Sequence, residues 1–328
     1  MRNDLYPLLF TPVYKSYLWG GSRLAAFYGR QGTPDVCAES WEVSDRAEGM
    51  SVVRNGPLAG RTLTSLVMDI GRPVIGAKAP PTGRFPLLIK LIDARQRLSV
   101  QVHPYHETAY RYGGESKTEA WVMLADAPGA CVYCGWREPM TEARFRALLA
   151  QGELAHALGR IEAKPGTAVY VPGGRVHAIG EGCLIFEVQQ NSNTTYRVDD
   201  WNRVDDDGKP RELHVEQAVK VIDWDDTAVT ARAPTRIRGG GENARWRLVS
   251  SPFFRLVRLD LAQTETVESD PSSFTCLFVQ RGAAVCNAAG MDVPLTAGTS
   301  CLVPAALERY TLCPAAPSTS LVVTRLGR

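Results

Sequence analysis

The sequence predicts a mainly β protein with two related β-barrel (jelly-roll) units and a small helical insert. Its 29 glycines and 21 prolines separate short, β-branched segments that alternate apolar and polar residues, a pattern typical of antiparallel strands joined by turns. One motif occurs twice with the same spacing, as Gly166-Thr167-x-x-x-Val171-Pro172 and as Gly298-Thr299-x-x-x-Val303-Pro304. Duplication of a barrel would explain the repeat, although a short turn before a strand can also recur by chance.

The first unit is expected over residues 1–240 and the second over residues 241–328. Between Thr230 and Arg245 the apolar periodicity stops and three glycines occur in a row, at 239–241, which predicts a linker. No histidine follows His214, and the second copy of the motif aligns Arg309 with His177. The second unit is therefore expected to contribute packing rather than a second copy of a histidine site.

Few helices are expected. Thr141 is a plausible N-cap for a helix with Phe145 on its apolar face, and a second helix is expected from Leu154 to Ile161, so that the insert spans about residues 141–161. A further helix is predicted from Thr62 to Asp69.

Composition and charge exclude several classes of function. The 37 basic and 35 acidic residues give a formal net charge of +2, so no global field favours nucleic acid or an anionic membrane. No apolar run reaches membrane-spanning length, and residues 1–14 lack the layout of a signal peptide, which predicts a cytoplasmic protein. Among the eight cysteines, only Cys131 and Cys134 form a Cys-x-x-Cys pair, and we expect both to be buried thiols.

Three segments carry the residues that suggest chemistry. Strict alternation from Leu98 to His103 puts Ser99, Gln101 and His103 on one face of a strand. Alternation likewise groups Lys117, Glu119 and Trp121, and a Pro-Gly-Gly turn at 172–174 leads to His177. Taken singly, each has an ordinary explanation: a solvated strand face, a surface ion pair and a hydrogen-bonded core histidine.

Together these segments resemble a known family. Gln-x-His-Pro (101–104), Lys-Thr-Glu (117–119), Val-Pro-x-Gly-x-x-His-Ala-Ile (171–179) and the run from Gln189 to Arg203 are similar to motifs of the type I mannose-6-phosphate isomerases of the cupin superfamily. Trp-Gly-Gly (19–21), Glu-Ser-Trp-Glu-Val-Ser (39–44) and Phe-Pro-Leu-Leu-Ile-Lys (85–90) extend the resemblance, which is close over residues 6–222. Tyr105-His106 and Ala120 depart from the family pattern without affecting a proposed ligand.

The resemblance implies a site. Its metal, expected to be one Zn²⁺ or another divalent ion, would be bound by Gln101, His103, Glu119 and His177. Arg197 would be the active-site arginine, and Lys117, Lys90 and Ser99 would face the sugar phosphate. The implied reaction interconverts mannose 6-phosphate and fructose 6-phosphate through an enediolate.

These residue types suit that reaction. Zn²⁺ can stabilise a developing oxyanion without changing its oxidation state, and Arg197 adds a permanent cation with a fixed fork of donors. Lys117 is suited to anchor the phosphate or to transfer a proton, and the group that takes the C2 proton stays open.

Two other functions compete with this interpretation. Two histidines and one carboxylate are also the ligand set of non-haem iron oxygenases, although Gln101 would fill a coordination position that such enzymes leave open. A barrel that binds a sugar phosphate without turning it over is the other alternative. The sequence leaves the preferred sugar phosphate, the metal bound in the cell and the oligomeric state open.

Overall fold

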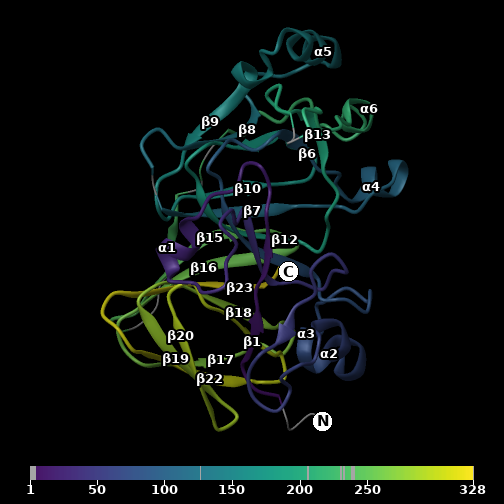
Figure 1. The fold of residues 1–328 in the computed structure, drawn as a ribbon. Helices are drawn as coiled ribbons and strands as arrows, with labels where there is room; N and C mark the ends of the chain where they lie inside the picture. Colours follow the sequence, from purple (N-terminus) through teal and green to yellow (C-terminus); the bar gives the residue numbers. More distant parts are fainter. Residues whose placement is uncertain are drawn as a thin grey trace. The chain divides into compact units, whose positions relative to one another are not determined.

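The computed structural model describes residues 5–125, 127–204, 207–229, 231, 233–237 and 241–327. It is mainly β, with few helices, as predicted (Figure 1). The chain forms two compact units: unit 1 comprises residues 1–13, 41–89 and 233–328, and unit 2 comprises residues 14–40 and 90–232. The predicted boundary at residue 240, like residues 230, 232 and 238–240 of the predicted linker, lies outside the described residues.

Unit 2 is built mainly on two antiparallel sheets, and the chain crosses between the units within three strands of the first sheet. In spatial order, this six-stranded sheet contains β10 (Ala168–Val171), β7 (Glu119–Ala125), β12 (Leu184–Gln190), β5 (Leu87–Asp93), β3 (Glu39–Val43) and β2 (Val13–Lys15). The five-stranded sheet contains β13 (Tyr196–Asp199), β6 (Val100–Val102), β11 (His177–Ile179), β8 (Cys131–Trp136) and β9 (Leu158–Glu162).

Unit 1 also has two sheets. The larger, eight-stranded sheet contains β14 (Thr235–Ile237), β15 (Ala244–Ser250), β16 (Phe254–Leu261), β23 (Thr319–Leu326), β18 (Thr275–Arg281), β21 (Ser300–Val303), β1 (Leu8–Thr11) and β4 (Val52–Val53). The smaller contains β17 (Glu265–Glu268), β22 (Arg309–Pro314), β19 (Ala283–Ala288) and β20 (Met291–Thr296). Because β1 pairs with β21, the N-terminal strand completes a sheet made mostly of C-terminal residues.

The two units repeat one strand order. The series β10-β7-β12-β5 in unit 2 corresponds to β21-β18-β23-β16 in unit 1, and β6-β11-β8-β9 corresponds to β17-β22-β19-β20. The repeated sequence motif makes the same turn in both: Gly166 N–H donates to Met123 O, and Gly298 N–H donates to Val279 O, each at 2.8 Å. Both glycines have φ near +80°, at 81° and 82°, a conformation that favours glycine. This agreement supports duplication over chance recurrence.

The helices agree with the sequence in part. The helices are α1 (Arg23–Tyr28), α2 (Leu63–Ile70), α3 (Arg72–Ile75), α4 (His106–Tyr112), α5 (Glu142–Gln151) and α6 (Val215–Ala218). Helices α2 and α5 are those predicted, with Thr62 and Thr141 as their N-caps. The prediction of a second helix in the insert, from Leu154 to Ile161, was wrong. Residues Leu154–Ala157 form a single 3₁₀ turn, and Ile161 belongs to strand β9.

The reason for that error lies in the pairing of β9 with β8. Ile161 is opposite Val132 and packs, with Val132, into an apolar cluster of unit 2. A run of spaced apolar residues this short fits a helix or a strand, so tertiary pairing determines the outcome. Helix α5 packs through buried Phe145 against Trp136 of β8, with ring centroids 6.2 Å apart.

Both residues of the Cys-x-x-Cys pair, Cys131 and Cys134, are buried free thiols, as expected. Burial raises the pKa of the Cys134 thiol to about 12, which keeps it protonated and unreactive. Within the described residues, no helix is long and apolar enough to span a membrane.

Candidate metal centre and substrate cavity

Three neighbouring strands of one sheet of unit 2, together with β7 of the other sheet, bring the predicted metal ligands and Arg197 together. His177 on β11 is directly opposite Gln101 on β6, and Gln101 is directly opposite Arg197 on β13. His103 follows the end of β6, where Pro104 comes next in the chain, and Glu119 begins β7. Segments about a hundred residues apart in the sequence therefore meet at one place.

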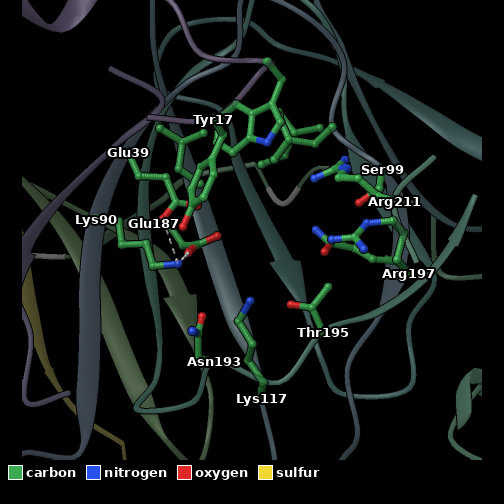
Figure 2. Close-up of a pocket in the computed structure, with 15 residues that line it drawn as sticks. Tyr17, Glu39, Lys90, Ser99, Lys117, Glu187, Asn193, Thr195, Arg197 and Arg211 are labelled. Carbon is green, nitrogen blue, oxygen red and sulfur yellow. Dashed lines mark ion pairs between the residues drawn. The ribbon is translucent and has the colours of Figure 1, made fainter. Parts of the chain in front are cut away.

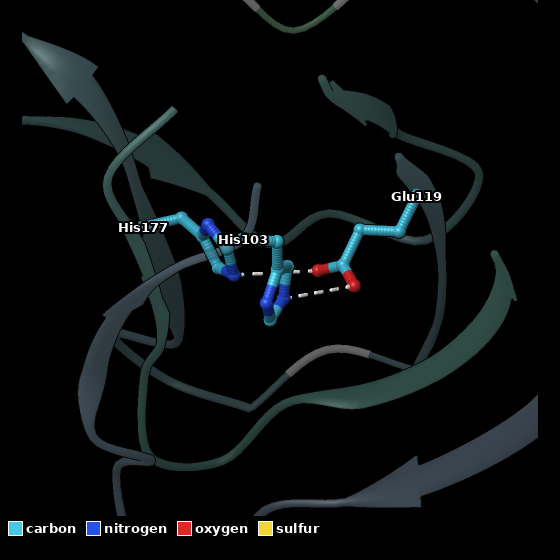
Figure 3. A group of neighbouring side chains, drawn as sticks. All are labelled: His103, Glu119 and His177. Carbon is cyan, nitrogen blue, oxygen red and sulfur yellow. Dashed lines mark ion pairs between the residues drawn. The ribbon is translucent and has the colours of Figure 1, made fainter. Parts of the chain in front are cut away.

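The carboxylate of Glu119 faces the imidazoles of His103 and His177 (Figure 3). The Nε2 atoms of His103 and His177 are each 3.4 Å from a different oxygen of the Glu119 carboxylate. All three side chains are buried, and their potential ligand atoms lie within 4.8 Å of one another. Among the described residues this is the one group of three or more His, Cys, Asp or Glu side chains that could hold a metal ion.

The protonation states of this cluster suit a metal. Burial, together with Lys117 for His103, lowers the pKa values of both histidines, that of His103 to about 3. Although burial opposes ionisation of Glu119, Lys117 and His103 hold its pKa well below the usual range. Two neutral imidazoles and one carboxylate are therefore available, which is a common ligand set for Zn²⁺ and similar divalent ions.

The orientation of the His177 ring is fixed by a hydrogen bond at Nδ1. Its Nδ1 lies 2.8 Å from the backbone carbonyl of Arg175, and because a carbonyl only accepts, Nδ1 carries the proton. The lone pair of Nε2 then faces Glu119, and this buried atom has no hydrogen-bond partner. An outer hydrogen bond of this kind is usual for metal-binding histidines, so the residues present fit a metal.

Arg175 is itself held by a buried ion pair. Its Nε and Nη2 donate to the two oxygens of Asp226, each at 2.6 Å, and its Nη1 donates to Tyr170 O at 2.8 Å. The turn that precedes His177 is thereby fixed at both its backbone and its side chain.

Lys117 lies beside the proposed ligands. Its buried ammonium group is 2.9 Å from Glu119 Oε2 and 3.0 Å from His103 Nε2. Gln101 is half-buried and lies next to His177 across the sheet. Both Lys117 and Gln101 line a cavity of 320 Å³ in unit 2, a volume large enough for a small substrate.

The cavity has two contrasting sides (Figure 2). Lys90 and Glu187 lie on one side with Glu39 and Tyr17, whereas Ser99 lies opposite with Arg197 and Arg211. All the site residues predicted from the sequence therefore line this cavity or form the adjoining His-Glu-His cluster. No role was expected for Glu39, Glu187 or Arg211, although Glu39 belongs to the Glu-Ser-Trp-Glu-Val-Ser motif at 39–44.

On the first side, a lysine bridges two carboxylates. Lys90 Nζ is 3.5 Å from Glu39 Oε2 and 3.5 Å from Glu187 Oε1. Burial raises the pKa of Glu187 to about 7, and Trp121 Nε1 donates to its Oε2 at 3.0 Å. The positive charge of Lys90 is therefore largely balanced by its neighbours.

The opposite side carries two arginines. Arg211 Nε donates to Asp200 Oδ2 at 2.7 Å, which fixes its guanidinium in one orientation. Arg197 Nη1 donates to the backbone carbonyl of Glu212 at 2.8 Å. Its buried Nε has no hydrogen-bond partner, and burial together with Arg211 lowers its pKa. This side can therefore receive an anion.

The fold and the site define the chain as a two-unit β protein with a metal-ligand set beside a polar cavity. Residues 8–133 match the family described as phosphomannose isomerase type I, catalytic domain. Mannose-6-phosphate isomerase of Streptococcus mutans is 37% identical over 257 residues, 78% of this chain and 79% of that protein. Probable mannose-6-phosphate isomerase GmuF of Bacillus subtilis is 42% identical over 220 residues, 66% of this chain and 68% of that protein.

Solved structures agree. Mannose 6-phosphate isomerase from Bacillus subtilis superposes with a TM-score of 0.86 at 30% identity, covering 97% of this chain and 99% of that one. The apo form of mannose 6-phosphate isomerase from Salmonella typhimurium, at 17% identity, shares the fold with a TM-score of 0.75, covering 98% and 99%. This chain belongs to the type I phosphomannose isomerase family, which confirms the resemblance inferred from its motifs.

Proposed function

We propose that this protein interconverts mannose 6-phosphate and fructose 6-phosphate at the cavity of unit 2, with one divalent metal, expected to be zinc, bound by Gln101, His103, Glu119 and His177. The observation that carries the proposal is the buried His103–Glu119–His177 cluster beside a cavity with two arginines on one side. Gln101 is included because its neighbour across the sheet is His177. Its amide oxygen would complete a set that keeps the metal net positive.

The bound metal would supply Lewis-acid stabilisation of the negative oxygen that develops as the proton moves between C1 and C2 of the sugar. Arg197 faces the same cavity and provides a second, permanent positive charge for that oxygen or for the phosphate. The ammonium of Lys117, 2.9 Å from Glu119, can donate a hydrogen bond to a sugar oxygen close to the metal ligands. It can exchange a proton there when desolvated.

The phosphate is best accommodated by the side of the cavity that carries Ser99, Arg197 and Arg211. A guanidinium offers a planar fork that matches phosphate oxygens, and the ion pair with Asp200 fixes that of Arg211. Lys90 also lines the cavity, but two carboxylates balance its charge. Lys90 and Glu187 are therefore suited to bind sugar hydroxyl groups. We expect the reaction to take place in the cytoplasm.

The test is an assay of fructose 6-phosphate formation from mannose 6-phosphate by the purified protein. The rate should fall to background after chelation and return on addition of one equivalent of zinc or another divalent ion. Full activity in protein shown by elemental analysis to be metal-free would contradict the metal assignment. Absence of turnover in protein with one metal per chain would contradict the isomerase assignment, and oxygen uptake with iron would then favour an oxygenase.

A further inference from the structure

Unit 1 contains a second cavity that is rich in positive charge. It measures 210 Å³ and is lined by Arg255 on β16, Arg325 on β23 and Lys78. Val257 and Val323 contribute an apolar floor. All of these residues belong to unit 1, so the cavity is separate from the proposed isomerase site.

The two arginines form an unusual pair. Arg255 and Arg325 are directly opposite each other in the antiparallel pairing of β16 with β23, and like charges in that position repel and destabilise a sheet. The Nε atoms of both are buried without a hydrogen-bond partner. Both side chains are half-buried, and two adjacent cations with buried, unpaired donors are costly unless an anion compensates them.

Neighbouring groups leave this charge largely uncompensated. Arg325 donates through Nη2 to the backbone carbonyl of Asp270 at 3.0 Å, a neutral acceptor. The one carboxylate lining the cavity, that of Asp270, is 3.2 Å from Lys78 Nζ and accepts a hydrogen bond from the backbone of Ser272. Three cations thus face one carboxylate, which is already bonded to Lys78 and to Ser272.

The lip of the cavity is held in place by the backbone. Lys78 N–H donates to Ser272 O at 2.8 Å, and Ser273 Oγ accepts from Leu326 N–H at 2.9 Å. The segment that carries Lys78 and the segment that carries Asp270 are thereby fixed beside strand β23. The positive charges are consequently presented in a preformed concave site.

We propose that this cavity binds a small phosphate-bearing anion, either inorganic phosphate or a phosphate monoester whose carbon portion lies over Val257 and Val323. Two guanidinium groups facing one space match a group with three charged oxygens better than a single carboxylate. The cavity is smaller than common ligand pockets, which limits the occupant to a compact molecule. Binding would relieve the repulsion between Arg255 and Arg325.

The experiment compares Arg255→Gln with a matched control, Arg247→Gln, on the adjacent strand β15. Arg247 is exposed and does not line the cavity. Equilibrium dialysis of each full-length protein with inorganic phosphate and, separately, with glycerol 2-phosphate measures the number of anions bound per chain. Sodium chloride at matched ionic strength controls for screening.

The control should bind as many equivalents as the wild type. Arg255→Gln should lose one equivalent or bind it about tenfold more weakly, the loss expected for one charge-assisted hydrogen bond. Loss of both probes indicates a general phosphate site, and loss of the ester alone indicates that the carbon portion is also recognised. Equal stoichiometry and affinity in Arg255→Gln and Arg247→Gln would overturn the proposal.

Thermal unfolding provides an independent test, because the substitution should weaken phosphate binding without lowering the stability of the phosphate-free protein. Without phosphate, Arg255→Gln should unfold at the same temperature as the wild type or higher, because a repulsive pair has been removed. With phosphate, the wild type should gain more stability than the variant. A variant that is less stable without phosphate but gains as much from it would show that Arg255 is structural only. Arg325→Gln, tested in the same way, should reproduce the loss of binding.

Discussion

The two units share a strand order and a turn, yet their interiors differ in chemical character. Glu119 at the start of β7 is opposite Val171, and at the corresponding place in unit 1 Thr275 is opposite Val303. Where unit 2 gathers two histidines and a carboxylate, unit 1 has a continuous apolar cluster that includes Leu277, Tyr310 and Leu312. One architecture therefore supports either a metal site or a packed core, depending on a few inward-facing side chains.

Strand β22 shows how that difference arises. The sequence repeat aligns Arg309 with His177, but Arg309 is exposed and its Nε lies 2.8 Å from Glu268. The next residue, Tyr310, is buried in the apolar cluster. A side chain contributes to the interior of such a unit only if the strand alternation points it inwards, which is why Arg309 is no counterpart of His177.

The largest expected effect comes from removing a metal ligand. His177→Ala should lose bound metal and lower kcat/KM by about 10³-fold or more, since both Lewis-acid and ligand geometry are lost. Arg309→Ala, at the aligned position of unit 1, should keep full metal content and activity. Elemental analysis and the isomerase assay measure both quantities, and unchanged metal content in His177→Ala would contradict the ligand set.

Arg197→Ala separates the substrate side of the cavity from the metal. This variant should keep one metal per chain while kcat/KM falls by about 10²- to 10³-fold, the usual cost of losing one stabilising donor. The lysine variant, Arg197→Lys, should recover part of the loss because it restores the charge without the fork. Near-normal turnover in Arg197→Ala would refute its assignment.

Asp226→Asn tests the support behind His177. The substitution leaves the buried guanidinium of Arg175 without its ionised partner, so the free energy of unfolding should fall by about 3 kcal/mol. Because the Arg175 carbonyl orients His177, metal affinity should also fall by about 10- to 100-fold. Competition with a chelator, at a temperature where the variant is folded, measures the affinity. A loss of stability with unchanged metal affinity would show that the ion pair does not position the ligand.

A smaller effect should appear in the pH dependence of stability. Burial raises the pKa of Glu187 from 4.5 to about 7, so the folded state holds its proton to higher pH than the unfolded state does. Its contribution to stability is complete below about pH 4.5 and is lost as the pH rises through 7. Glu187→Gln cannot lose this contribution. Its free energy of unfolding, measured relative to that of the wild type, should therefore be more than about 1 kcal/mol higher at pH 8 than at pH 5. Urea unfolding at both pH values measures the change, and a relative gain at low pH would contradict it.

Local patterns in the sequence were enough to predict several site residues and two of the helices. Alternation placed Gln101 and His103 together, a turn delivered His177, and threonine N-caps marked helices α2 and α5. Sequence alone did not predict that Ile161 lies in a strand, because its partner Val132 is distant in the chain. The position of Arg211 was not predicted for a related reason. Its guanidinium is held by Asp200, and the chain turns between these two residues.

The charges that surround Lys90 and the two arginines of unit 1 could not be predicted from the sequence either. Lys90 was expected to face a phosphate, yet its two carboxylate partners come from β3 and β12, and no local pattern links these strands to β5. The repulsion between Arg255 and Arg325 likewise depends on the register of β16 against β23. Properties that depend on pairing between distant strands require the structure.

We propose that His103, Glu119 and His177 hold one divalent ion in unit 2. Anomalous X-ray diffraction from crystals of the zinc-loaded protein tests it most directly. We predict one strong peak per chain, at about 2.0–2.2 Å from an imidazole nitrogen of each histidine and from a Glu119 oxygen. Absence of a peak there, or full occupancy at another site alone, would contradict the claim.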